Sequence, residues 1–213
     1  MNKAIRHVIF DFDGTLADSS DGVVDAVNYS LRKVGSPERR PEEIKPFIGF
    51  PLTHMYPHFT DAPIAELYAF FRERADISVP EATMALPGAD ETIRALHSRG
   101  LKLAIATTKV RRNLDDALSR LKWVELFHAT VGGDEVAQVK PAPDAFITAL
   151  DLLRATTENS IAVGDTVNDI AAAQAVPMPV VAVKCPYSEN NGVADLKPDY
   201  SISSINELLN IVG

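Results

Sequence analysis

Short runs of apolar, largely β-branched residues alternate with segments of helical periodicity along most of this 213-residue sequence. Runs of this length are too short for helices and predict strands, at residues 7–10, 101–106, 129–131, 161–163 and 180–183. Helical patterns occupy the intervals, at residues 88–98, 110–121, 143–154 and 167–175, before a last strand at 199–202 and a last helix at 204–211. Such alternation is typical of βαβ units. The sequence therefore predicts an α/β fold built on a parallel sheet.

One long segment after the first strand interrupts this alternation. Between residues 18 and 84 only helical patterns occur, at 22–34, 42–47 and 62–75, with breaks that contain Gly or Pro, the last at Ser78-Val79-Pro80. A helical block inserted into an α/β alternation predicts a second, smaller domain. We therefore expect a core domain of residues 1–17 and 85–213 and a small all-helical domain of residues 18–84, inserted after the first strand.

The charge balance and the cysteine content narrow the classes of partner. With 29 acidic and 21 basic side chains the net charge is −8, which disfavours broad electrostatic binding to nucleic acid or to an anionic membrane. We therefore expect a small-molecule partner, no nucleic acid and no membrane. The single cysteine, Cys185, excludes an internal disulfide, no signal-peptide pattern precedes Asp11, and the longest apolar stretch is shorter than the ~20 residues of a spanning helix. These features predict a cytoplasmic protein, either a monomer or a homodimer.

Paired carboxylates follow two of the predicted strands. Asp11-Phe12-Asp13-Gly14-Thr15 comes directly after the first strand, and Gly164-Asp165-Thr166-Val167-Asn168-Asp169 follows the strand at 161–163. Open parallel sheets bind ligands beyond the carboxyl ends of their strands, so both pairs lie where chemistry is expected. The structural alternatives are a simple turn for the first motif and a helix N-cap role for Asp165. Hard oxygen ligands on a rigid scaffold suit Mg²⁺.

Two further polar residues follow other predicted strands. Thr107 comes after the strand at 101–106, and Lys140 lies beyond the strand at 129–131. Each residue alone has a structural interpretation, Thr107 as a helix cap and Lys140 as a surface lysine. Together with the carboxylates they supply a hydroxyl and an ammonium for phosphoryl oxygens, which phosphoryl transfer needs besides a metal.

Four features follow one another along the chain: the motif at residues 11–15, Thr107, Lys140 and the motif at residues 164–169. In this order they resemble the four motifs of the haloacid dehalogenase superfamily, and the helical segment resembles that family's helical cap. The stretches most similar to its phosphoglycolate phosphatase-like branch are residues 11–28, 49–52 and 140–144. The resemblance spans nearly the whole chain. It implies a Rossmann-like parallel core and a Mg²⁺-dependent phosphatase that hydrolyses a small phosphomonoester through an aspartyl-phosphate.

The resemblance also implies a role for each motif residue. Asp11 would attack the substrate phosphorus, and Asp13 would protonate the leaving oxygen and then take a proton from the hydrolytic water. Thr107 would hold a phosphoryl oxygen, and Lys140 would balance the charge around Asp11.

The implied magnesium site draws on both carboxylate motifs. Asp165 would be a direct ligand together with the Asp11 carboxylate and the backbone carbonyl of Asp13. Asp169 would orient the metal's waters or Lys140.

Substrate contacts are expected from Gly14, Thr108, Lys45 and Gly49. Thr108 stands where relatives of this branch usually have Asn, which leaves open the contact that the amide makes. Lys45 is the expected cap cation for an anionic substrate such as phosphoglycolate, and an exposed helical lysine is its structural alternative. Whether Phe50 or His54 contacts substrate stays open.

Three alternative functions accompany this prediction. A phosphomutase similar to β-phosphoglucomutase would need basic residues at Gly49-Phe50-Pro51-Leu52, where this chain has none. A pyrophosphatase is a second alternative, because members of this branch with nearly identical motifs differ in substrate. The third is a non-catalytic regulatory module on the same scaffold, against which the presence of Asp11, Asp13, Lys140 and Asp165 argues.

Overall fold

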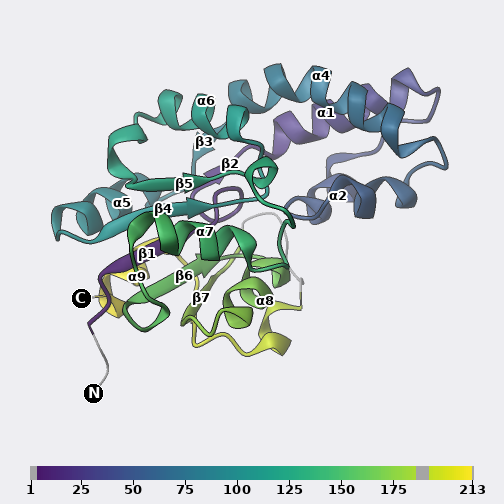
Figure 1. Cartoon of the computed structure of the whole chain (residues 1–213). Coiled ribbons are helices and arrows are strands. Elements are labelled where there is room, and N and C mark those ends of the chain that lie inside the picture. Colours follow the sequence, from purple (N-terminus) through teal and green to yellow (C-terminus); the bar gives the residue numbers. More distant parts are fainter. Residues whose placement is uncertain (1–3, 186–191, 213) are drawn as a thin grey trace.

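A six-stranded, entirely parallel sheet forms the centre of the computed structural model, which describes residues 4–185 and 192–212 (Figure 1). The strand order is β5-β4-β1-β6-β7-β8. The strands are β1 (His7–Phe10), β4 (Lys102–Ala106), β5 (Ala129–Val131), β6 (Ser160–Gly164), β7 (Val180–Val183) and β8 (Tyr200–Ile202). The predicted α/β fold with a Rossmann-like parallel sheet is confirmed, and the predicted strands lie within one residue of their observed bounds.

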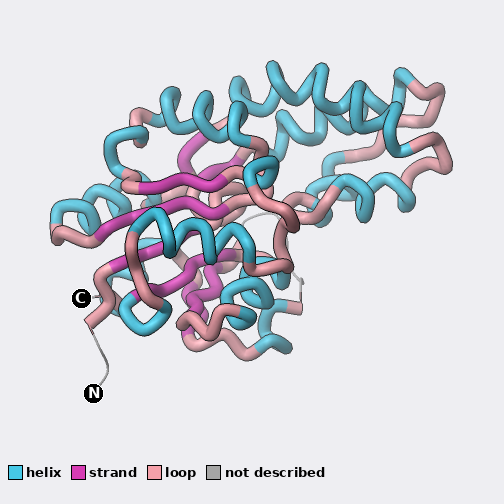
Figure 2. The backbone as a smooth tube through the Cα atoms, in the orientation of Figure 1, coloured by secondary structure: helices cyan, strands magenta, loops and turns pink. Residues whose placement is uncertain are grey.

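Helices cover both faces of this sheet, as the tube view of the backbone also shows (Figure 2). They are α5 (Ala89–Ser98), α6 (Arg111–Leu121), α7 (Asp144–Leu153), α8 (Val167–Ala175) and α9 (Leu208–Ile211). Successive strand residues point to opposite faces, so Val8 and Phe10 pack in the cluster with α5, α6 and α9, whereas Ile9 packs in the cluster with α7 and α8. Because both faces are buried, the strands are almost continuously apolar.

The segment between β1 and α5 is largely helical and has an apolar core of its own. Its helices are α1 (Ser20–Lys33), α2 (Pro41–Ile44), α3 (Leu52–Met55) and α4 (Ile64–Ala82), with 3₁₀ turns at Lys45–Phe47 and Tyr56–His58. We call residues 18–84 the helical insert. Val27, Leu31, Ile44 and Leu67 are fully buried within it, and α1 packs along α4.

Three details of the chain differ from the predicted elements. A pair of two-residue antiparallel strands, β2 (Ala17–Asp18) and β3 (Met84–Ala85), joins the two ends of the insert, and strands this short carry no periodic signal. The predicted break at Ser78-Val79-Pro80 is wrong, because α4 continues through Pro80, where burial of Val79 and Pro80 outweighs the helix-breaking tendency of proline. The predicted last helix is a 3₁₀ turn (Ile205–Glu207) followed by α9.

Among the described residues, no helix combines the length and the apolar character that crossing a membrane requires.

Candidate active site

The carboxyl ends of β4, β1 and β6 bring the predicted site residues to one edge of the sheet. These three strands are neighbours, and Phe10 at the end of β1 is in register with Ile105 and Val163. The next residues along each strand direction are therefore close in space. Thr107 follows β4, Asp11 follows β1 and Asp165 follows β6.

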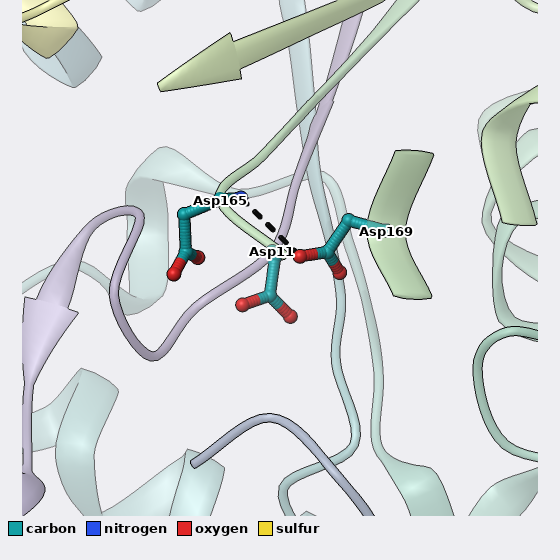
Figure 3. Close-up of side chains that lie close together, drawn as sticks. All are labelled: Asp11, Asp165 and Asp169. Atoms are coloured by element: carbon teal, nitrogen blue, oxygen red, sulfur yellow. Dashed lines mark hydrogen bonds between the residues drawn. The ribbon is translucent and has the colours of Figure 1, made fainter. Parts of the chain in front are cut away.

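Three carboxylates meet at this edge of the sheet (Figure 3). All three are buried. One oxygen each of Asp11, Asp165 and Asp169 lies within 4.8 Å of the others. Lys140, only 1% exposed, donates from Nζ to Asp11 Oδ1 at 2.8 Å and to Asp169 Oδ1 at 2.6 Å. The surface-lysine interpretation of Lys140 is therefore wrong, and one ammonium bridges two of the three carboxylates.

One ammonium does not offset the charge of three buried carboxylates, and the pKa values of Asp11 and Asp165 are raised. Burial, together with the neighbouring Asp169, raises the pKa of Asp11 to about 7, although Lys140 acts in the opposite direction. Burial beside Asp169 and Asp11 raises the pKa of Asp165 well above its usual value. Burial alone would lower the pKa of Lys140, but the adjoining carboxylates raise it. The site therefore favours an additional positive charge.

Local backbone structure holds each of these carboxylates in place. The N-cap of α8 is Thr166, so the interpretation of Asp165 as an N-cap is wrong and its carboxylate is directed to the cluster. Asp169 Oδ2 accepts from the Thr166 backbone N at 2.9 Å and from its hydroxyl at 2.6 Å. Thr15 donates to Asp165 Oδ1 at 2.8 Å. Gly14 lies so close that a Cβ there would be 2.3 Å from Asp165 Oδ2.

This donor set fits a hard divalent cation. Asp11, Asp165 and Asp169 each offer a carboxylate oxygen as a metal ligand, and these oxygens converge on one point. Together the three carboxylates carry more negative charge than Lys140 neutralises. The carboxylate of Asp13 accepts hydrogen bonds from Lys109. Only the backbone carbonyl of Asp13 is therefore left for its expected role as a metal ligand.

Asp13 is held by two residues that were not predicted from the sequence, Lys109 and Ser19. Lys109 Nζ donates to both carboxylate oxygens of Asp13, at 3.1 and 2.9 Å, and to Ser19 Oγ at 3.2 Å. Ser19 donates to Asp13 Oδ1 at 2.6 Å. Lys109 lies two residues after Thr107 in the same loop, so its position in the sequence was the only available signal, and its burial is visible only in the structure. The nearby Thr107 hydroxyl is buried and accepts from the Lys109 backbone N at 3.2 Å.

A pocket of about 270 Å³ lies between the helical insert and the strand ends. Asp13, Thr108 and Lys109 line it on the sheet side, and the insert contributes mainly apolar side chains, among them Phe50 and Leu52. We call this the Asp13 pocket.

The other residues selected in the insert lie in different surroundings. Gly49 lines the Asp13 pocket, and its carbonyl accepts from Asn168 Nδ2 at 3.2 Å, so the loop that carries it contacts α8. Lys45 is not among the lining residues and pairs with Asp21 at 2.9 Å. His54 also lies outside the lining and stacks on Phe50 with ring centroids 5.3 Å apart.

The fold and this arrangement of carboxylates define a class of protein. The sequence model of the family described as haloacid dehalogenase-like hydrolase matches residues 8–183, and the chain belongs to this family. The predicted family is confirmed, and the chain is a hydrolase of this class.

Among its relatives is the pyrophosphatase PpaX of Bacillus cereus, which is 29% identical over 209 residues, covering 98% of this chain and 97% of the relative. A solved haloacid dehalogenase-like protein from Streptococcus pneumoniae is 26% identical with a TM-score of 0.90, over 98% of this chain and 99% of that one. A hydrolase of the same type from Bacteroides fragilis is 27% identical with a TM-score of 0.88, over 96% and 99% of the two chains.

Proposed function

We propose that this protein is a Mg²⁺-dependent phosphatase that hydrolyses a phosphomonoester through an aspartyl-phosphate on Asp11. The observation that carries the proposal is the buried cluster of Asp11, Asp165 and Asp169 with Lys140 between two of its members. We further propose that residues 18–84 act as a cap on a core of residues 1–17 and 85–213. The Asp13 pocket between them would hold the organic part of the ester.

The first half of the reaction forms the phosphoenzyme. A carboxylate oxygen of Asp11 bonds to phosphorus while the bond from phosphorus to the ester oxygen breaks, and the Asp13 carboxyl gives its proton to that oxygen. In this proposal, Thr107 donates to a phosphoryl oxygen. Lys140 holds Asp11 in place through the 2.8 Å hydrogen bond.

The second half releases phosphate and restores both carboxylates. Asp13, now ionised, takes a proton from water, whose oxygen bonds to phosphorus as the bond to Asp11 breaks. Mg²⁺ held by Asp11, Asp165 and the backbone carbonyl of Asp13 would neutralise phosphoryl charge throughout. In this scheme Asp169 fixes Lys140, to which it is joined at 2.6 Å.

Pyrophosphate hydrolysis is a second candidate, supported by the similarity to PpaX across 98% of the chain. The same residues would carry it, since a phosphate group would replace the organic leaving group.

The proposal is tested by measuring phosphate release from phenyl phosphate with Mg²⁺ and with EDTA. Asp11→Asn preserves the size of the side chain and removes the nucleophile, so turnover should fall by at least about a thousandfold. The thermal unfolding curve of the variant serves as the control for folding. A folded Asp11→Asn protein that retains turnover would show that Asp11 is not the nucleophile.

A further inference from the structure

The lining of the Asp13 pocket shows which kind of leaving group the site accepts, and this inference rests on the proposed phosphatase function. Asp13 is the proposed proton donor, so the ester oxygen must lie beside it. Because Asp13 also lines the pocket, the group bonded to that oxygen extends into the pocket. The character of the lining therefore bears directly on substrate class.

Aromatic and aliphatic side chains make up most of the lining. Phe47, Phe50, Tyr68 and Phe71 contribute rings, and Leu52 and Val79 contribute aliphatic groups. At about 270 Å³ the volume is just below the lower end of the roughly 300–1,000 Å³ typical of ligand pockets. Such a space suits a single ring or a short branched chain.

The described lining offers no free cation to an anionic leaving group. Its two charged residues are Asp13 and Lys109, and they pair with each other at 2.9 Å. Nearby cations outside the lining are also paired: Lys45 with Asp21, and Arg112 with Asp76 at 2.8 Å. A carboxylate or a second phosphate in this pocket would have to compete with Asp13 for Lys109, and without that cation it would lose its hydration and gain no counter-ion, which is strongly unfavourable.

One polar group in the lining has no partner. Asn113, in the first turn of α6, is 6% exposed, and its Oδ1 atom is buried without a hydrogen bond from any described residue. Buried amides are usually paired, and Asn113 also lines the pocket, so a small turn of this side chain would let a ligand group in the pocket complete its hydrogen bonding. The matching group is an uncharged hydroxyl on an otherwise apolar body.

We propose that the physiological leaving group is an uncharged, largely apolar alcohol that bears one hydrogen-bonding group facing Asn113. This substrate class excludes phosphoglycolate, whose leaving group carries a carboxylate, and pyrophosphate, whose leaving group is itself a phosphate.

The test compares kcat/KM for phenyl phosphate and para-carboxyphenyl phosphate, which differ by one charge. We expect phenyl phosphate to be favoured by at least about tenfold, because the added carboxylate is desolvated without a partner. The carboxylate does not make the phenol a poorer leaving group, so chemistry alone does not predict this order. Pyrophosphate and phosphoglycolate should be poorer substrates than phenyl phosphate.

A charge introduced into the pocket should change this preference. Thr53 is an exposed lining residue, and Thr53→Lys should shift the ratio of the two kcat/KM values toward the carboxylated ester by about tenfold. Thr156→Lys makes the same substitution at an exposed position at the opposite, amino end of β6 and should leave the ratio unchanged.

The amide is tested with meta-hydroxyphenyl phosphate. The wild type should favour it over phenyl phosphate by about tenfold, and Asn113→Leu should abolish that preference while retaining activity on phenyl phosphate. Equal or better hydrolysis of the carboxylated ester, phosphoglycolate or pyrophosphate would overturn this inference and leave the phosphatase proposal standing. Absence of Mg²⁺-dependent hydrolysis of every ester would overturn both.

Discussion

Two buried lysines form ion pairs with different carboxylates of the site. Lys140 binds Asp11 and Asp169, and Lys109 binds Asp13. Each lysine thus holds one of the two carboxylates to which the proposal assigns chemistry. A buried ion pair contributes little net stability, so the value of these pairs lies in positioning.

Lys109→Met tests this positioning role. Methionine retains the apolar part of the side chain and removes the ammonium, so Asp13 loses a partner at 2.9 Å while the cluster around Asp11 is untouched. We expect kcat for phenyl phosphate to fall by about tenfold or more, with KM changed little, because proton transfer and not binding is impaired.

Two further variants accompany this measurement. Lys109→Arg should recover part of kcat because it restores a cation to Asp13. Lys102→Met, at an exposed position on β4, should behave like the wild type. An unchanged kcat in Lys109→Met would contradict the positioning role.

Part of this site could be predicted from the sequence alone. Asp11, Thr107 and Asp165 directly follow the carboxyl ends of neighbouring strands, and the strand pattern was enough to bring them together. Lys109 and Asn113 could not be selected in this way. The partner of Lys109 is 96 residues away, and the significance of Asn113 lies in a missing hydrogen bond that only packing reveals.

At the scale of elements, the close approach of α1 and α4 determines the shape of the helical insert. Gly22 in α1 contacts the backbone of α4, so a Cβ there would lie 2.4 Å from Ser78 O and 2.7 Å from Val79 Cα. Ser78 Oγ donates to Gly22 O at 2.8 Å across the same contact. Only glycine permits this separation.

Gly22→Ala should therefore destabilise the protein although alanine is the better helix former. The propensity gain is about 1 kcal/mol, and overpacking against backbone costs about 1–3 kcal/mol. The two backbone contacts below 3 Å place the cost at the upper end of that range, so we expect a net loss of about 2 kcal/mol in the free energy of unfolding, measured by urea denaturation. Ser98→Ala, at an exposed position in α5, is the matched control and should change stability by less than about 0.5 kcal/mol. A Gly22→Ala protein as stable as the wild type would contradict the contact.

Elements with strong local periodicity were predicted well, and those determined by packing were not. The strands of the sheet are apolar and bounded by turn residues, so their positions follow from the sequence. The last turns of α4 depend on burial of Val79 and Pro80, which local propensity does not report. The pairing of β2 with β3 is likewise a tertiary contact between residues far apart in the chain.

At the scale of the whole molecule, the site is assembled from both sides of the insertion. The sheet supplies the carboxylates, and the insert supplies the apolar side of the Asp13 pocket. The hydrogen bond from Asn168 to the Gly49 carbonyl joins α8 to a loop of the insert. Asn168 immediately precedes Asp169 of the carboxylate cluster. In our proposal the sheet thus carries the chemistry, whereas the insert and the first turn of α6 together select the leaving group.

The charge of the cluster predicts how Mg²⁺ affects the stability of the whole protein. The pKa of Asp11 is about 7 in the folded chain against an ordinary value of 3.8, so the metal-free folded state binds a proton that the unfolded state has lost. This stabilisation is complete below pH 3.8 and is lost as the pH rises through about 7. The raised pKa of Asp165 acts in the same direction.

Mg²⁺ would replace those protons, so it should raise the melting temperature more at about pH 8 than at about pH 5. Burial lowers the pKa of His128, and this shift makes the protein more stable as the pH rises, opposite to the effect of Asp11. The informative quantity at each pH is therefore the difference between the melting temperatures with Mg²⁺ and with EDTA. Asp165→Asn should raise the melting temperature of the metal-free protein at about pH 8, because it removes a repelled carboxylate, and should diminish the Mg²⁺ effect. A Mg²⁺ effect of equal size at both pH values, or one unchanged in Asp165→Asn, would show that the metal binds away from this cluster.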